Sequence, residues 1–328
     1  MTAATATKPR LGFLGVGWIG RMRLDALARA GAAEVAAVFD PAGADVPGAT
    51  AVGSLDELLE SELDGVVIAT PSALHAEQAI EALDRGLPVF CQKPLALTAV
   101  ETREVVEAAR RADRLLRVDF CYRELDAARR LKEIVDAGAL GRVFAADLVF
   151  HNAYGPDKSW FYDVAQAGGG CVIDLGIHLV DLALWLLGFP RVEGASSRLF
   201  SGGRPLEAGE RVGEEYALAD VRLDGGAVVR LACSWRAHAG RDCEIGATFY
   251  GTDGAVSLRN LDGSFYDFVG ESLMGTTTEL LSSPPDEWGG RAAVAWATGV
   301  AAGGRFDPRA EQYVRVAEVI DRIYGREP

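Results

Sequence analysis

The chain has 328 residues, of which 49% are hydrophobic, and its formal net charge at pH 7 is −14. This length and composition exclude a disordered protein and are sufficient for two globular domains with cores of their own. The acidic balance argues against nucleic acid as a partner, because binding to phosphates needs clustered Lys and Arg that the chain does not gather in one place.

The first ten residues contain no apolar segment of signal-peptide length and no twin arginine, so we expect a cytoplasmic protein. The five cysteines are scattered and never form a C-x-x-C pair. They therefore predict neither a disulfide framework nor a zinc site.

A glycine-rich turn follows the first predicted strand. Residues 10–20 begin as a short apolar strand and continue into the pattern G-x-G-x-x-G, after which a helix is predicted to about residue 30. In this fingerprint the glycines permit a tight turn, the approach of a pyrophosphate and close packing of helix on strand. A chance match in a glycine-rich chain is the competing interpretation. The residues expected to contact the dinucleotide here are Gly15, Gly17, Trp18, Ile19 and Gly20.

The second predicted strand, residues 34–40, ends in an acidic residue. Asp40 is placed to accept hydrogen bonds from the 2′-hydroxyl of a ribose. Between Arg29 and Arg85 the sequence contains no Lys or Arg, so this strand end offers no local cation for a 2′-phosphate. The pattern favours NAD over NADP, although a simple strand-ending turn at Asp40 is an alternative.

Strands and helices continue to alternate as far as residue 120, with further strands predicted at residues 64–70, 88–91 and 115–120. This alternation is typical of a doubly wound, mainly parallel sheet whose ligands bind at the carboxyl ends of the strands. One such end carries Gln92, Lys93 and a proline. Lys93 is either an ordinary solvated charge or a group held rigidly to stabilise negative charge on a reacting oxygen.

Residues 168–188 begin with three glycines, after which the run is apolar on nearly every side. In a helix, Asp174, His178 and Asp181 would lie on one stripe, because offsets of four and seven nearly complete whole turns. A membrane span is one interpretation, but the run is short and carries two aspartates near its middle. A core helix with a satisfied histidine is another. A metal site at His178 and Asp181 has no recognisable third ligand, so we predict none.

The pattern changes after residue 122. A helix is predicted over residues 124–137 and is followed by strands with tight-turn signals between them. The predicted strands are residues 142–151, 192–200, 215–223, 227–235, 244–250, 255–259 and 264–268. We therefore predict an α/β plus α+β protein, with a Rossmann domain over residues 1–121 and a domain of open-faced, mainly antiparallel sheet covered by helices over residues 122–328.

The loop at residues 151–163 is dense in hydrogen-bonding and aromatic side chains. Such a loop either faces solvent or binds a hydroxylated ring. The hydroxyl groups at the edge of such a ring form hydrogen bonds with polar side chains, and its faces stack on aromatic side chains. The candidates for substrate binding are Arg123, His151, Asn152, Tyr154, Trp160 and Arg236, together with Asp174 and His178.

These motifs, in this order, resemble the Gfo/Idh/MocA family, the relatives of glucose-fructose oxidoreductase and inositol dehydrogenase, over essentially the whole length. The motifs are Gly15 to Gly20, Ala69-Thr70-Pro71 followed by His75, Lys93-Pro94, and Gly168 to Gly170 leading to Asp174 and His178. The chain departs at Gln92, where the family usually has glutamate; an amide keeps hydrogen-bonding capacity but loses the charge.

The resemblance implies that Thr70, Pro71, His75, Gln92 and Lys93 belong to the cofactor site. It also implies that Lys93, Asp174 and His178 form the catalytic group. The open face of the second sheet would cover another subunit of a homodimer or homotetramer.

The leading hypothesis is an NAD-dependent dehydrogenase that oxidises a secondary alcohol of a sugar, cyclitol or related polyol. His178 would take the hydroxyl proton, Lys93 would stabilise the alkoxide, and Asp174 would orient the lysine or bind a neighbouring hydroxyl. One alternative is an NAD-retaining enzyme that oxidises its substrate transiently to cleave a glycoside or epimerise a carbon. The other is a cofactor-sensing binding protein without catalysis.

Overall fold

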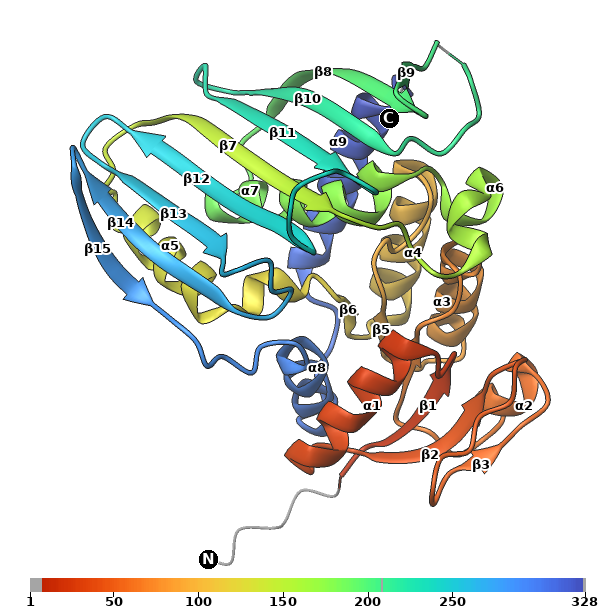
Figure 1. Cartoon of the computed structure of the whole chain (residues 1–328). Coiled ribbons are helices and arrows are strands. Elements are labelled where there is room, and N and C mark those ends of the chain that lie inside the picture. Colours follow the sequence, from red (N-terminus) through yellow and green to blue (C-terminus); the bar gives the residue numbers. More distant parts are fainter. Residues whose placement is uncertain (1–7, 208, 327–328) are drawn as a thin grey trace, which may run out of the picture. The chain divides into compact units, whose positions relative to one another are not determined.

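The computed structural model describes residues 8–207 and 209–326 and divides into two compact units. The first comprises Met1–Cys121 with Gly289–Val314, and the second comprises Tyr122–Trp288 with Arg315–Pro328. The sequence predicts residues 289–314 in the second domain, whereas the structure packs them with the first. Figure 1 labels the helices and strands of both units.

The first unit is built on a six-stranded sheet in the order β3-β2-β1-β4-β5-β6, with every pair of neighbours parallel. This is the strand order of a Rossmann fold. Its strands are β1 (Arg10–Leu14), β2 (Glu34–Phe39), β3 (Thr50–Ala51), β4 (Gly65–Ile68), β5 (Val89–Cys91) and β6 (Leu116–Val118). Its helices are α1 (Trp18–Ala30), α2 (Leu55–Leu59), α3 (His75–Asp84), α4 (Ala99–Ala112) and α8 (Arg291–Ala301), with short 3₁₀ turns at Ser72–Leu74 and Pro308–Ala310.

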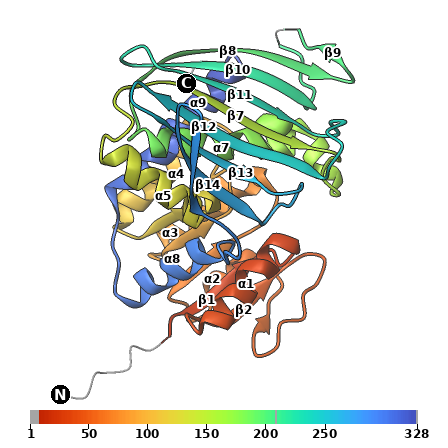
Figure 2. The same ribbon diagram turned by 60° about the vertical axis from the view of Figure 1, so that its left-hand side comes forward.

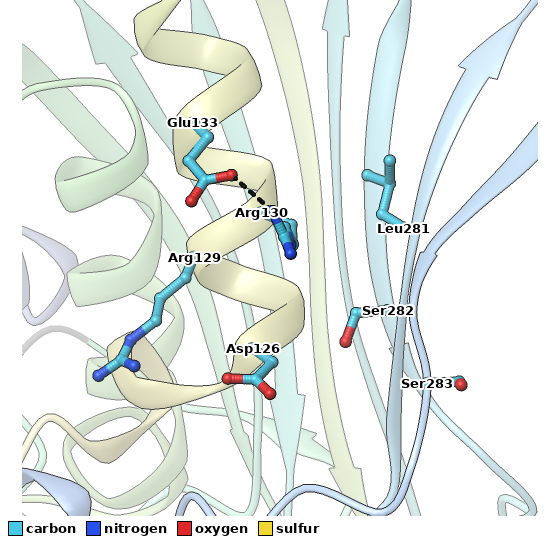
Figure 3. Close-up of a pocket in the computed structure, with 7 residues that line it drawn as sticks. All are labelled: Asp126, Arg129, Arg130, Glu133, Leu281, Ser282 and Ser283. Atoms are coloured by element: carbon cyan, nitrogen blue, oxygen red, sulfur yellow. Dashed lines mark hydrogen bonds and ion pairs between the residues drawn. The ribbon is translucent and has the colours of Figure 1, made fainter.

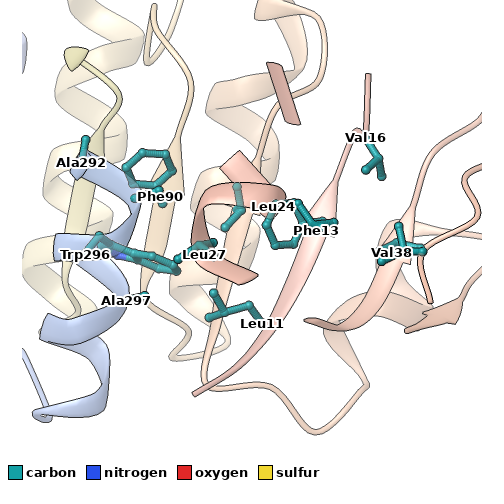
Figure 4. Close-up of a cluster of buried hydrophobic side chains, with 13 residues drawn as sticks. Leu11, Phe13, Val16, Leu24, Leu27, Val38, Phe90, Ala292, Trp296 and Ala297 are labelled. Atoms are coloured by element: carbon teal, nitrogen blue, oxygen red, sulfur yellow. The ribbon is translucent and has the colours of Figure 1, made fainter. Parts of the chain in front are cut away.

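Helix α8 completes the hydrophobic core of the first unit (Figure 4). Trp296 on α8 is fully buried, and its ring lies 5.7 Å from that of Phe90 on β5. A methyl group at Gly65 would lie 3.0 Å from the Trp296 ring. The glycine therefore leaves room for the indole to pack against β4. The sequence of an apolar helix face does not show which of two hydrophobic cores the helix packs into. For this reason residues 289–314 were predicted in the second domain although they belong to the first unit.

The second unit is built on a nine-stranded sheet in the order β15-β14-β13-β12-β7-β11-β10-β8-β9. All of its neighbouring pairs are antiparallel except β7 with β11. The strands are β7 (Val143–Asn152), β8 (Val192–Ser201), β9 (Arg204–Pro205), β10 (Tyr216–Leu223), β11 (Val228–Ser234), β12 (Cys243–Gly251), β13 (Ala255–Asn260), β14 (Phe268–Met274) and β15 (Thr277–Ser282). The predicted open-faced, mainly antiparallel sheet is confirmed.

Helices cover one face of this sheet, as Figures 1 and 2 show for α5, α7 and α9. They are α5 (Asp126–Asp136), α6 (Val164–Ala167), α7 (Ile177–Leu186) and α9 (Glu311–Ile323), with 3₁₀ turns at Cys121–Glu124 and Ser159–Tyr162 and a π-helical segment at Val172–Gly176. Burial alternates along β10, as expected for a strand with one covered and one open face.

One predicted strand is wrong. Residues 264–267 form a turn, and β14 begins only at Phe268. The hydroxyl of Ser264 accepts hydrogen bonds from the backbone N–H groups of Tyr266 and Asp267. Because these two N–H groups donate to the serine hydroxyl, they are not available for hydrogen bonds to a neighbouring strand.

The stretch Val164–Leu186 has the length and hydropathy of a membrane span, but 83% of its most apolar window is buried within the protein. A buried apolar stretch of this kind is typical of a core helix.

Candidate active site

The glycine-rich turn uses its three glycines in different ways. Gly15 has a φ of +81°, and a methyl group there would lie 2.5 Å from the carbonyl oxygen of Ala69. A methyl group at Gly20 would lie 2.3 Å from the carbonyl oxygen of Gly15. The fold therefore requires both glycines. At Gly17, which precedes α1, a methyl group would meet no atom of residues 8–207 and 209–326 within 4 Å.

This open space fits a dinucleotide. The first N–H groups of a helix have no partner within the helix, and they attract a phosphate together with the helix dipole. The exposed Gly17 leaves such a group room to approach α1. Trp18, the first residue of α1, is 69% exposed, and Ile19 is partly buried.

Asp40 holds the glycine-rich turn in place. Its two carboxylate oxygens accept hydrogen bonds from the backbone N–H groups of Val16, at 2.8 Å, and Ala42, at 2.9 Å. A carboxylate has about four lone-pair sites, so both oxygens retain capacity for ribose hydroxyls. Asp40 therefore has a local structural role beside its predicted contact with the cofactor.

His75 joins the turns after β4 and β5. Its ring nitrogens lie 2.7 Å from the carbonyl oxygen of Pro94 and 2.8 Å from that of Thr70, and the side chain is buried. Burial lowers the pKa of His75, and the two carbonyl oxygens partly offset this effect. The family resemblance implies that His75 belongs to the cofactor site. In the structure, its ring holds the backbone of Thr70 and of Pro94, the residue after Lys93.

Lys93 is partly buried in the turn after β5. Burial lowers the pKa of His75 and raises that of Cys121 to about 12, and the ammonium charge of Lys93 acts to lower the pKa of both groups. Gln92 is buried beside two residues that the sequence analysis did not name, Arg23 and Asp119.

In the second unit, Glu214 caps the segment that carries the predicted catalytic residues. Its carboxylate accepts hydrogen bonds from the N–H groups of Gly170, at 3.0 Å, and Val172, at 2.8 Å. The hydroxyl of Tyr324 donates to the same carboxylate at 2.9 Å. Burial raises the pKa of Glu214, and these three donors oppose the rise.

The glycines before this segment allow that contact. A methyl group at Gly170 would lie 2.1 Å from the backbone oxygen of Glu214, and one at Gly169 would lie 2.0 Å from the hydroxyl of Tyr324. Sequence reasoning missed Glu214 and Tyr324, because nothing local to either position indicates that it meets the glycines.

Asp174 lies in the π-helical segment, and His178 and Asp181 follow in α7. The indole N–H of Trp235 donates to Asp174 at 3.0 Å. The ring of Tyr122 lies edge-on to His178 with centroids 5.0 Å apart. These contacts orient the two predicted catalytic side chains of this unit, and Trp235 and Tyr122 were not foreseen.

Asp181 forms a buried ion pair with Arg123. The guanidinium donates to both carboxylate oxygens, at 2.8 and 2.5 Å. Burial raises the pKa of Asp181, and the neighbouring Arg123 opposes the rise. Arg123, predicted to bind substrate, thus has a partner within its own unit; its contact with substrate stays a prediction.

The other predicted substrate residues lie on different faces of the sheet. His151 is on the open face, where it contacts the hydroxyl of Ser234 at 2.7 Å and stacks on Tyr216. Burial lowers the pKa of His151. Asn152 pairs with the buried Cys243 and so points to the helix-covered face. Its Oδ1 atom is buried and has no hydrogen-bond partner in the described part of the chain.

The loop after β7 gathers aromatic rings. Trp160 stacks on Phe161 with centroids 3.8 Å apart, and Tyr154 is half-exposed. Arg236 lies over the ring of Tyr162 and donates to Glu215 at 2.6 Å. Arg236 therefore links Tyr162 of the loop to Glu215, and Trp160 and Tyr154 are partly accessible.

A pocket of about 420 Å³ lies elsewhere, between α5 and β15 (Figure 3). Among its charged groups, Arg130 pairs with Glu133 and Arg129 pairs with Glu124, which lies outside the pocket lining. None of the predicted site residues lines it. Within residues 8–207 and 209–326, no three His, Cys, Asp or Glu side chains gather as a metal ion would require.

Two family models match the chain in order. The model described as an oxidoreductase family with an NAD-binding Rossmann fold matches residues 10–120, and that of the GFO/IDH/MocA C-terminal domain matches residues 128–257. Among solved structures, levoglucosan dehydrogenase in complex with NADH and levoglucosan has a TM-score of 0.80 at 22% identity and covers 96% of both chains. At this identity the likeness shows the fold alone.

Among curated proteins, the rhizopine catabolism protein MocA of Rhizobium meliloti is 32% identical over 188 residues, or 56% of this chain and 58% of that protein. The chain spans less than two thirds of the length of this and the next three relatives. A protein of Amycolatopsis mediterranei (strain S699), which bears the name of a UDP-kanosamine synthase oxidoreductase subunit, is 31% identical over 300 residues, or 83% of this chain and 82% of its own length. With both family models matched in order and a relative aligned over most of its length, the chain belongs to the Gfo/Idh/MocA oxidoreductase family, whose first domain is an NAD(P)-binding Rossmann fold.

Proposed function

We propose that the protein is an NAD-dependent oxidoreductase that transfers hydride between the nicotinamide and a secondary alcohol of a sugar, a cyclitol or a related polyol. The observation that carries the proposal is the turn before α1, where Gly15 and Gly20 serve the fold and Gly17 leaves space that no described residue fills. Asp40 supports NAD over NADP, because a carboxylate there would repel a 2′-phosphate.

When bound, the nicotinamide would supply the hydride chemistry. We assign to His178 the transfer of the substrate hydroxyl proton and to Lys93 the stabilisation of the alkoxide. Asp174, which Trp235 orients, would bind a neighbouring hydroxyl or orient the lysine. The half-buried setting of Lys93 supports its role, because charge stabilisation is stronger where water is scarce.

The substrate class rests on the loop after β7 and on the relatives. Partly accessible rings such as Trp160 and Tyr154 offer stacking surfaces, and Asn152 carries a buried oxygen that no described donor satisfies. A hydroxylated ring would match both features. A curated relative that is 29% identical over 217 residues bears the name levoglucosan dehydrogenase, and this name supports a sugar-like substrate.

The test is a panel of sugars and cyclitols screened with NAD and NADP in parallel, with NADH formation followed at about 340 nm. We expect turnover with NAD on at least one polyol. His178→Ala should remove most of this turnover and leave NADH affinity nearly unchanged, while the exposed His238→Ala serves as the matched control. Equal turnover in His178→Ala would rule out the proposed role of that residue.

The same screen separates the alternatives. Loss of substrate without net NADH formation, in protein that retains NAD through purification, would indicate the transient-oxidation reaction. Binding of NADH without turnover on any substrate of the panel would indicate the cofactor-sensing protein.

We also propose that the open face of the nine-stranded sheet binds a second copy of the chain. Tyr216 and Leu218 on β10 are large apolar side chains exposed on this face. Large apolar side chains that lie next to each other on an uncovered sheet face are typical of a surface that binds a partner.

A further inference from the structure

A buried cluster of three side chains in the first unit holds the turn that carries Lys93. Gln92, at the end of β5, donates its amide N–H to Oδ2 of Asp119 at 2.5 Å, and Asp119 follows the neighbouring strand β6. Arg23, on α1, donates to the same oxygen at 2.5 Å. All three side chains are less than 10% exposed.

We propose that Asp119, itself fixed by Arg23, is a positioning residue for Lys93. It holds the side chain of Gln92 and thereby the backbone of the turn that presents the lysine. Because this proposal concerns how Lys93 is held, its functional part rests on the proposed function above.

The charge balance of the cluster accounts for the amide at position 92. One guanidinium faces one carboxylate, and the amide donates without adding charge. A glutamate at this position would bring a second carboxylate to the place from which the amide now donates. The Oδ1 atom of Asp119 is buried and has no partner among the described residues, so no further donor there offsets a second negative charge. One of the two acids would therefore take up a proton.

The charged and titratable groups around Asp119 come from several elements. Besides Arg23, they include the thiols of Cys91 and Cys121, whose pKa values are raised first by burial and further by the carboxylate of Asp119. The charge of Lys93 also reaches Cys121, in the opposite sense. The same thiol thus senses the carboxylate and the ammonium, which supports an electrostatic link between Asp119 and Lys93 in addition to the link through Gln92.

The test compares Gln92→Glu, Asp119→Asn and the double variant, which exchanges the acid and the amide. Thermal unfolding of each full-length protein is measured between pH 5 and 8 without cofactor. In Gln92→Glu, a carboxyl group with a raised folded-state pKa contributes stability that is present at low pH and lost as the pH rises. Its unfolding midpoint should therefore fall further below that of the native protein as the pH increases, and the double variant should restore the native profile.

Fluorescence titration with NADH gives the functional readout. We expect Gln92→Glu to weaken NADH binding by about tenfold and the double variant to return it to within about twofold of the native value. Thr102→Val, which removes a buried hydroxyl on α4, is the control for a general loss of stability and should keep native NADH affinity. If Gln92→Glu does not fold, recovery of folded protein by the second substitution counts as the same restoration.

Two results would overturn the proposal. The charge-balance part is wrong if the double variant is no better than Gln92→Glu in stability at pH 8. The positioning part is wrong if the variants change stability but NADH affinity stays native in all of them. If the native protein itself does not bind NADH, the proposed function fails while the pH profiles still test the charge balance.

Discussion

At the scale of single residues, the sequence identifies side chains by chemical type but not by partner. Arg123 and Asp181 illustrate this, since each was singled out separately and the structure joins them in one buried pair. Gln92 likewise looked like an isolated departure from a motif until Asp119 and Arg23 gave it a setting. Glu214 and Trp235 gave no signal at all, because their roles arise from neighbours distant in sequence.

The ion pair leads to a prediction that distinguishes a structural from a substrate-binding arginine. Replacing Arg123 with Met leaves Asp181 buried without its counter-charge, and this should cost about 3–5 kcal/mol of stability at pH 8. Burial already raises the pKa of Asp181 and Arg123 opposes the rise, so the variant's folded-state pKa should rise further. An acid of this kind stabilises the fold at low pH and loses that contribution as the pH rises. The deficit should therefore be smaller at pH 5.

Urea unfolding followed by circular dichroism at both pH values measures this. The double variant Arg123→Met with Asp181→Asn should recover most of the loss, because no buried charge remains. Arg130→Met, at an exposed pair on α5, should have little effect. An Arg123→Met protein as stable as the native one, with weakened binding of the identified substrate alone, would show that Arg123 is a substrate ligand.

At the scale of elements, the sequence predicts most helices and strands because each has a local signal. Residues 215–223 alternate in polarity between turn signals, and the structure places β10 at Tyr216–Leu223. Strand β15 was missed because its positions are largely exposed and carry no such alternation. The π-helical segment Val172–Gly176 lies within a run that is apolar on nearly every side apart from Asp174, so its periodicity does not reveal a local change of helix type.

The N-terminus of α1 allows a test of what the glycine fingerprint does. Gly17→Ala should change the unfolding free energy by no more than about 1 kcal/mol, since the methyl group meets no atom in the part of the chain that the structure describes. The same substitution should weaken NADH binding at least about tenfold if a phosphate approaches there.

Gly20→Ala is the matched comparison, because its methyl group would collide with the carbonyl oxygen of Gly15. It should lower stability by about 1–3 kcal/mol, as overpacking does. Thermal unfolding and NADH fluorescence titration on both variants measure the contrast. Native NADH affinity in Gly17→Ala would show that the cofactor does not approach this turn.

At the scale of the whole molecule, the division into two units is only partly visible in sequence. The boundary near residue 121 coincides with a change from alternating strands and helices to strands joined by hairpin turns. Local sequence patterns are sufficient to predict such a change. The return of residues 289–314 to the first unit depends on Trp296 filling a core built from β1 and β5. Such long-range packing has no local signature, because a helix with an apolar face fits many cores.

The open face of the nine-stranded sheet gives the prediction for assembly. If a second copy covers this face, a charge there should oppose association, because burying an unpaired ammonium is costly. Leu218 on β10 is 41% exposed, and Leu218→Lys should shift the protein from an oligomer to a monomer without lowering its stability much. Val100→Lys places the same change at an exposed position of α4 in the first unit and should keep the native assembly. Light scattering coupled to gel filtration measures the mass; a native protein that is monomeric, or an oligomer unaffected by Leu218→Lys, would contradict the proposal.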